Sequence, residues 1–216
     1  MAQRASYLKP TTIRSLSWLI GLIGVVAAVA GPVYAINGAT QAAGAVEVPV
    51  ELAGQDDAGR TRVPLAVADL PDGTAVSARN GGSDVELSAE DSTIAEQLLS
   101  RGDALVLGLA LGAGAWLLRP VLGSLAAGRP FGSGNARRLA GLATVVVLAA
   151  GIGPLLPQIG SLVVLDRLDL VGPDSPFVVG VTFAVTPALV TALLLLVLAE
   201  AFRQGERISE DVEGLV

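Results

Sequence analysis

The sequence contains no cysteine and no histidine among its 216 residues. Without cysteine, the chain forms no disulfide and offers no thiolate to a metal ion. Without histidine, it lacks the commonest general base and the commonest metal ligand of proteins. Most catalytic constellations are therefore excluded. We expect a protein that is not an enzyme, with no catalytic residue, no metal site and no cofactor.

Charge is scarce as well. Only 16% of the residues are charged, 52% are hydrophobic, and the mean hydropathy is +0.64. A soluble domain of this length spreads charge along every helix, whereas long segments of this chain carry none. The formal net charge of -6 argues against direct binding to nucleic acid. This pattern indicates an integral membrane protein whose partner is the lipid bilayer.

Four apolar segments are long enough to cross that bilayer, because roughly 20 helical residues span the hydrocarbon layer. We predict an all-α membrane protein, a four-transmembrane-helix bundle with a small β-rich extracytoplasmic insert between the first and second spans. The predicted layout is as follows: 1–14 cytoplasmic N-terminus, 15–37 first span, 38–92 extracytoplasmic insert, 93–127 a helix with the second span, 128–136 cytoplasmic connection, 137–165 kinked third span, 166–175 extracytoplasmic connection, 176–203 fourth span, and 204–216 cytoplasmic tail.

The first span has an alternative interpretation. Its basic start, its apolar run and the small residues around Tyr34 are similar to a signal peptide with a cleavage site, although signal peptides have shorter apolar runs. Cleavage would leave three spans.

The insert shows the period-two alternation of half-buried strands. In VEVPVEL at 46–52 every second residue is apolar, and Pro49 predicts an edge strand. Further strands are predicted at 62–67, 74–78 and 84–88, with turn residues between them. We expect a small antiparallel sheet, with an irregular polar loop as the alternative. The acidic residues of the insert have no calcium-loop spacing and favour a solvated face.

Local signals place the helix ends. Thr93 and Glu96 form a capping-box sequence that predicts a helix start. Ser133 or Asn135 is a predicted cap of the third span, and Gly205 a predicted end of the fourth.

The basic residues orient the chain, because Lys and Arg near span ends stay on the cytoplasmic side. Nine of the fourteen lie in the two termini, the 128–138 connection and at Arg119, against five of the twenty acidic residues. The nine are Arg4, Lys9, Arg14, Arg119, Arg129, Arg137, Arg138, Arg203 and Arg207. Both termini are therefore predicted to be cytoplasmic at the cell membrane.

Two pairs of residues in the spans are candidates for helix contacts. Arg119 and Glu200 lie at inner ends of spans, where they either form an interhelix ion pair or extend separately to the headgroups. Gly108 and Gly112 have the four-residue spacing that lets helix backbones approach closely. This spacing predicts close packing of the second span, either against another helix of the same bundle or against a second copy in a dimer.

The tail has an apolar set at helical spacing, formed by Ile208, Val212 and Leu215 and surrounded by acidic residues. We interpret it as a docking surface for a cytoplasmic regulator protein, with a frayed end as the alternative. Oligomeric state does not follow from the sequence.

Two segments, GRPFGSGNARRL at 128–139 and AFRQGERISEDVEGLV at 201–216, resemble a bacterial four-pass membrane family known only as domain of unknown function 2975. The matching positions are Gly128, Pro130, Phe131, Asn135, Arg138, Phe202, Gly205, Asp211, Leu215 and Val216. The resemblance implies no reaction. Some members are encoded beside helix-turn-helix regulators, which implies membrane-linked control of transcription.

The spans carry no charge at mid-depth, which disfavours a proton or ion relay. We therefore predict a non-enzymatic sensor or regulator. The alternative is a small transporter, channel or transporter accessory subunit.

Overall fold

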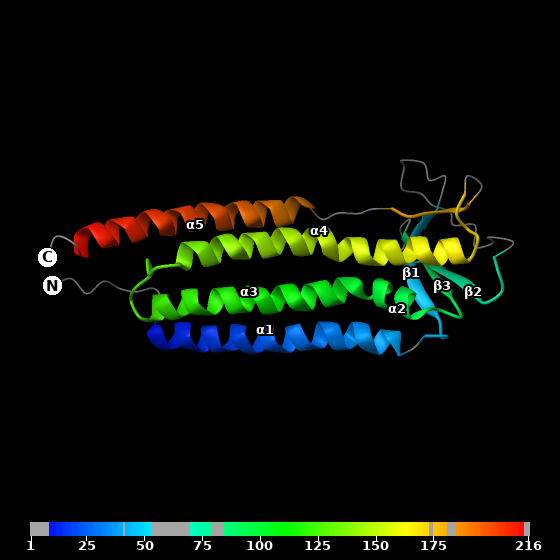
Figure 1. Cartoon of the computed structure of the whole chain (residues 1–216), viewed down its shortest axis with the longest axis horizontal. Helices are drawn as coiled ribbons and strands as arrows, with labels where there is room; N and C mark the ends of the chain where they lie inside the picture. Colours follow the sequence, from blue (N-terminus) through cyan, green and yellow to red (C-terminus); the bar gives the residue numbers. More distant parts are fainter. Residues whose placement is uncertain are drawn as a thin grey trace. The chain divides into compact units, whose positions relative to one another are not determined.

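The computed structural model describes residues 9–40, 42–52, 70–78, 84–172, 175–180 and 185–213. These residues are mostly helical, with one small sheet (Figure 1). In chain order the elements are α1 (Pro10–Ala39), β1 (Val46–Leu52), β2 (Thr74–Ala78), β3 (Asp84–Ala89), α2 (Ile94–Ser100), α3 (Gly102–Ala126), α4 (Asn135–Arg167), β4 (Phe177–Val178) and α5 (Val185–Glu213). Four of the helices, α1, α3, α4 and α5, are long and apolar enough to cross a membrane, as predicted.

The chain divides into two compact units. The described parts of 1–31, 107–150 and 184–216 form unit 1, which holds α5 and long portions of α1, α3 and α4. Unit 2 is formed by 32–106 and 151–183, and it contains the sheet and α2.

Small residues hold α1 against α3 in unit 1. A Cβ atom placed on Gly108 would lie 2.5 Å from the Ala27 carbonyl oxygen, and one on Gly112 would lie 2.6 Å from the Ala28 Cβ. On α1, Gly24 is buried against Ala115 of α3. The predicted packing role of Gly108 and Gly112 is therefore confirmed, and it is a contact within the chain.

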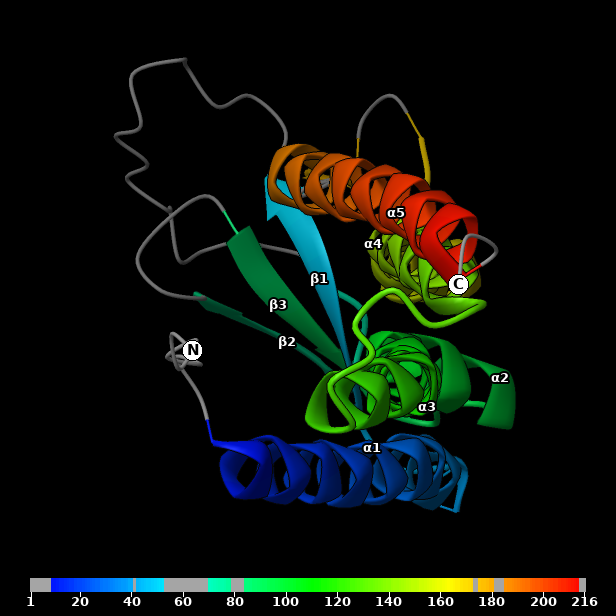
Figure 2. The same cartoon turned by 90° about the vertical axis from the view of Figure 1, so that its left-hand side faces the viewer.

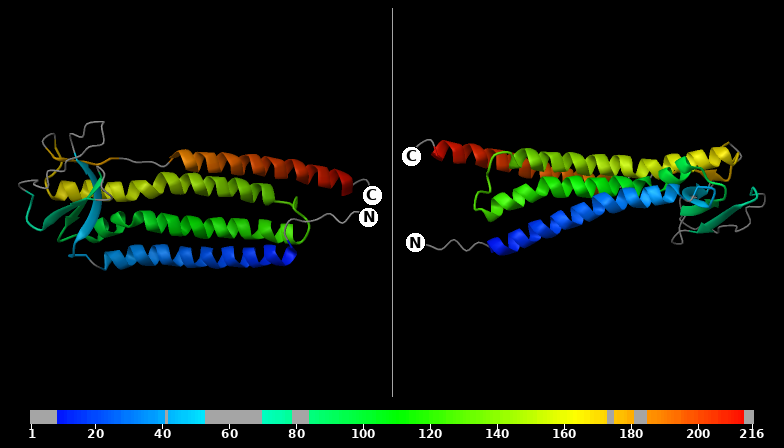
Figure 3. Two further views of the ribbon diagram at one scale, coloured as in Figure 1. Left: turned by 180° about the vertical axis from the view of Figure 1, so that it is seen from behind. Right: turned by 60° about the horizontal axis from the view of Figure 1, so that its bottom comes forward.

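The helices of unit 1 follow one another in chain order, so α3 lies beside α1 and α5 beside α4 (Figures 2 and 3). The start of α1, the α3–α4 connection and the end of α5 lie at the same end of the unit (Figures 1 and 3). At most 17% of the most apolar stretch of any of the four long helices is buried. Their large apolar side chains are exposed instead, as for Val25 at 65% and Leu193 at 66%.

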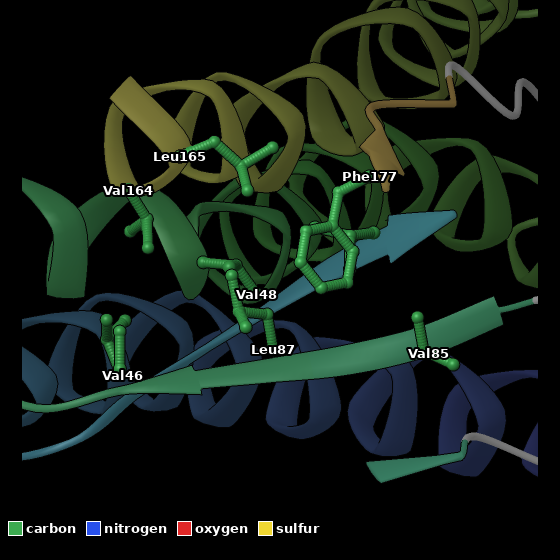
Figure 4. Packing of buried hydrophobic residues seen from close by; sticks show 9 residues of the cluster. Val46, Val48, Val85, Leu87, Val164, Leu165 and Phe177 are labelled. Carbon is green, nitrogen blue, oxygen red and sulfur yellow. The ribbon is translucent and has the colours of Figure 1, made fainter. Parts of the chain in front are cut away.

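The sheet of unit 2 has the strand order β2-β3-β1-β4, and its neighbours are antiparallel. The predicted strands at 46–52, 74–78 and 84–88 are confirmed; the one at 62–67 lies outside the described residues. One face of the sheet forms a core with the end of α4 (Figure 4). Its buried members are Val46, Val48, Val50, Val85, Leu87, Ala89, Val164, Leu165 and Phe177.

Pro49 does not mark a simple edge strand. β1 pairs with β3 along its length, and β4 pairs with its last two residues, Glu51 and Leu52. Because Pro49 has no amide hydrogen, it cannot donate to a further strand. Its carbonyl instead accepts a 2.7 Å hydrogen bond from the Ser161 hydroxyl of α4. A helix thus covers this part of the strand, in one of the ways that proteins protect a sheet edge.

Two predicted boundaries differ from the structure. The predicted helix 93–127 is divided at Arg101 into α2 and α3. The fourth long helix begins at Val185 rather than at 176, since Phe177–Val178 join the sheet. Pro187 therefore lies in the first turn of α5, where a proline leaves the helix intact.

The helix contact between α1 and α3 leads to a stability prediction. Gly108→Ala should lower the free energy of unfolding by about 1 to 3 kcal/mol, because the new methyl group meets α1 backbone that cannot turn aside. Gly123→Ala is the matched control on the same helix, since a Cβ there has nothing within 4 Å. Unfolding followed by circular dichroism in detergent measures both variants. Equal stability of the two would contradict the close approach.

Candidate functional site

The connection between α3 and α4 is a built turn in unit 1. Gly128 and Gly134 have φ angles of 72° and 85°, which residues with a side chain rarely adopt. Asn135, which is 1% exposed, holds the turn from its centre. Its amide nitrogen donates to the Ser124 hydroxyl at 2.6 Å and to the Pro130 carbonyl at 2.9 Å. Asn135 is thus the first residue of α4 and also fixes the connection before it.

Arg138 completes this arrangement by donating from Nη1 to the Asn135 side-chain oxygen at 3.1 Å. Every polar atom of the Asn135 amide is therefore used, as expected for a buried side chain. The sequence predicted Ser133 or Asn135 as the helix cap, whereas the structure has Asn135 inside the helix as its first residue, with bonds that the sequence did not reveal.

Phe131, in this connection, packs on the tail helix α5. Its ring lies against Gly205, where a Cβ atom would overlap it, and meets the Phe202 ring edge-on at 5.6 Å between centroids. The predicted end of the helix at Gly205 is therefore wrong. The glycine lies inside α5 because it makes room for an aromatic ring, and the helix continues to Glu213.

Two of the three predicted docking residues lie on this part of α5. Ile208 is 65% exposed, Val212 belongs to the helix, and Leu215 lies outside the described residues. The helical backbone through Val212 agrees with the spacing on which the prediction was based.

Among the described residues of unit 2, Glu96 is the most buried charged one, at 1% exposure. One carboxylate oxygen accepts from the Thr93 amide at 2.8 Å, which confirms the capping box. The other accepts from Nε of Arg167, also at 2.8 Å, and the Arg167 side chain is 28% exposed. The ion pair ties α2 to the end of α4. Sequence analysis missed it because the two residues are 71 positions apart.

Neighbouring polar side chains bind backbone groups. Gln97, 1% exposed, donates to the Ala45 carbonyl at 3.0 Å and to the Ser92 hydroxyl at 2.8 Å. The Ser92 hydroxyl donates in turn to the Gly44 carbonyl at 2.7 Å. This cluster joins α2 to the start of β1.

The predicted ion pair between Arg119 and Glu200 is not formed in the described structure. The Glu200 carboxylate binds Arg203, one turn further along α5, at 2.8 Å, and Gln204 donates to it at 3.0 Å. Arg119 lies along α1 instead, where a Cβ atom on Gly21 would be 3.5 Å from its Cδ. A partner within the same helix is nearer for Glu200 than one on α3.

The described residues hold no group of three or more carboxylates that would bind a metal ion. A scan against protein-family models, a search of curated proteins and a search of solved structures each found no match to the chain. The family resemblance drawn from the sequence therefore stays a prediction.

The buried pair gives a second stability prediction. Glu96→Ala should lower the free energy of unfolding by about 3 kcal/mol, since it removes a helix cap and leaves Arg167 without its anion. Glu90→Ala, an exposed acidic residue of the same unit, is the control and should change stability little.

A double-mutant cycle with Arg167→Ala isolates the pair. The two single effects should not add. Additive effects would mean that the carboxylate and the guanidinium act independently.

Proposed function

We propose that this chain is a four-pass protein of the cell membrane with both termini in the cytoplasm, and that it senses or regulates without catalysing a reaction. The sheet of unit 2 would face outward. The α3–α4 connection and the end of α5 would face the cytoplasm and bind a regulator protein there.

The observation that carries the proposal is the contact of Phe131 with α5. A rigid connection seated on the tail helix supports a defined surface, because it fixes one face of α5 and leaves Ile208 exposed beside it. An exposed Ile on a helix with acidic neighbours fits the helix-in-groove mode of protein recognition.

The location of the basic residues supports the orientation. Arg129, Arg137 and Arg138 belong to the connection and the start of α4, at the end of unit 1 where α5 also ends (Figure 1). Arginines at one end of apolar helices favour the cytoplasmic side of a membrane. Asp103 lies in the first turn of α3 and Asp166 in the last turn of α4, so on each of these two helices the acidic residue is at the end away from the connection.

α4 offers a physical connection between sensing and docking. It is one helix from Asn135 to Arg167. Its first residue fixes the connection, and its last turns contact the sheet through Ser161 and Val164. A ligand that shifted the sheet against α4 would act on a helix that begins at the docking surface.

Site-specific photo-crosslinking in native membranes tests the proposal. A photoreactive residue in place of Ile208 should crosslink to a cytoplasmic protein, and the same residue in place of Leu193 should crosslink to lipid. Phe131→Ala should reduce the Ile208 crosslink several-fold, because the tail loses the ring that positions it.

Two results would contradict a docking surface on the tail. If a photoreactive residue in place of Ser133, in the α3–α4 connection, captured the same proteins before and after deletion of residues 206–216, the tail would not be the docking surface. If that deletion had no effect while substitutions in the long helices altered the flux of a solute, the transporter interpretation would replace this one.

A further inference from the structure

Arg119 is a charged residue near the end of α3 with no ion pair in the described part of the chain. Its predicted partner, Glu200, is bound by Arg203. An arginine stays protonated in any protein environment. Next to a hydrocarbon layer, this guanidinium therefore requires an anion or water from outside the chain.

The side chain of Arg119 lies on the α1 side of α3. A Cβ atom on Gly21 would be 3.5 Å from Arg119 Cδ, 3.7 Å from Nε and 3.8 Å from Nη1, all ordinary contact distances. One turn before Gly21, the Ser17 hydroxyl donates to the Arg119 backbone carbonyl at 3.5 Å. The two helices thus present a guanidinium and a hydroxyl at one level of unit 1.

Both tryptophans of the chain flank this level. Trp18 follows Ser17 on α1 and is 64% exposed, and Trp116 lies one turn before Arg119 on α3 and is 78% exposed. Residues three apart on a helix are neighbours on its surface. Exposed tryptophans gather where a membrane protein meets the lipid headgroups, because the indole is apolar with one polar N–H.

The distance along α3 from Asp103 to Arg119 agrees with a position of the Arg119 side chain at the lipid headgroups. Asp103 in the first turn and Arg119 are the charged residues that bound its apolar part. Sixteen residues of helix rise about 24 Å, roughly 6 Å less than the hydrocarbon layer of about 30 Å, a difference that the long arginine side chain covers by extending toward the headgroups. The Arg119 guanidinium then lies at headgroup level on the inner side of the layer.

From these observations we infer that Arg119, with Ser17 beside it, binds the phosphate of an anionic phospholipid of the inner leaflet. The guanidinium fork matches the geometry of phosphate oxygens, and the Ser17 hydroxyl, which donates to the Arg119 carbonyl, holds this part of α3 beside α1. The exposed indoles would contact the glycerol and upper acyl region of the same lipid. The inference rests on the proposed membrane placement.

The two tryptophans provide the assay, because they are the only ones in the chain. The protein is reconstituted in phosphatidylcholine vesicles that contain a minor fraction of phosphatidylglycerol, with bromine on the acyl chains of one lipid at a time. Bromine quenches tryptophan fluorescence only at close range. We expect phosphatidylglycerol to be enriched about fivefold next to the tryptophans over its bulk fraction, as one arginine near an anionic lipid surface provides.

Arg119→Gln should abolish this enrichment. Arg137→Gln, which removes the same charge at an exposed position beyond the connection, should leave it unchanged. Arg119→Lys should retain part of it, because an ammonium keeps the charge but loses the fork. Enrichment that fell equally in Arg119→Gln and Arg137→Gln would overturn the site in favour of general attraction to positive charge.

Three further results separate the possible failures. Equal quenching by both brominated lipids in the unaltered protein would overturn the phosphate site but leave the membrane placement standing. Absence of quenching by either lipid would contradict the membrane placement itself. If sodium phosphate in pure phosphatidylcholine vesicles reproduced the effect of phosphatidylglycerol on tryptophan emission, the site would bind a free anion, and the lipid inference would fall.

Discussion

The constraint on which this structure depends is the exposure of long apolar helix surfaces that water does not solvate well. Four helices leave most of their Leu, Val and Ile side chains exposed, and at most 17% of any apolar stretch is buried. An apolar solvent such as lipid would remove the cost of exposing these side chains to water. It would also require that the backbone N–H and C=O groups be hydrogen-bonded within each helix. Solvation by an apolar medium would therefore explain both why these surfaces lack charge and why the helices are continuous.

In lipid there would be no hydrophobic force between such helices, and their contacts would have to come from close packing. Gly108 and Gly112 meet Ala27 and Ala28, so the backbones of α1 and α3 approach each other closely. Polar side chains act at several of the helix ends. Asn135 holds the α3–α4 connection, and the pair of Glu96 with Arg167 holds α2 against the end of α4. The apolar helix surfaces are therefore held by close packing of small residues, and these helix ends by hydrogen bonds and an ion pair.

The sequence predicted features that depend on neighbours along the chain. The four long helices, three strands, the Thr93 capping box and the glycine spacing on α3 all follow from local periodicity or composition. Contacts between distant segments were not predictable in this way. The joining of Phe177 to β1, the 71-residue separation of Glu96 and Arg167, and the fit of Phe131 on Gly205 leave no local pattern. For Gly205, the usual association of glycine with helix ends gave the wrong answer, because here the glycine makes space inside the helix.

Cysteine accessibility tests the central claim most directly, because the chain has no cysteine of its own. Single cysteines would replace Ser77 in β2, Ser133 in the α3–α4 connection and Leu193 in α5, all exposed positions. Intact cells would then be treated with a maleimide that does not cross membranes. The account predicts labelling at 77 without permeabilisation, at 133 only after it, and at 193 in neither case. Labelling at 193 in intact cells, or equal labelling at 77 and 133, would contradict a chain that crosses the bilayer with these four helices.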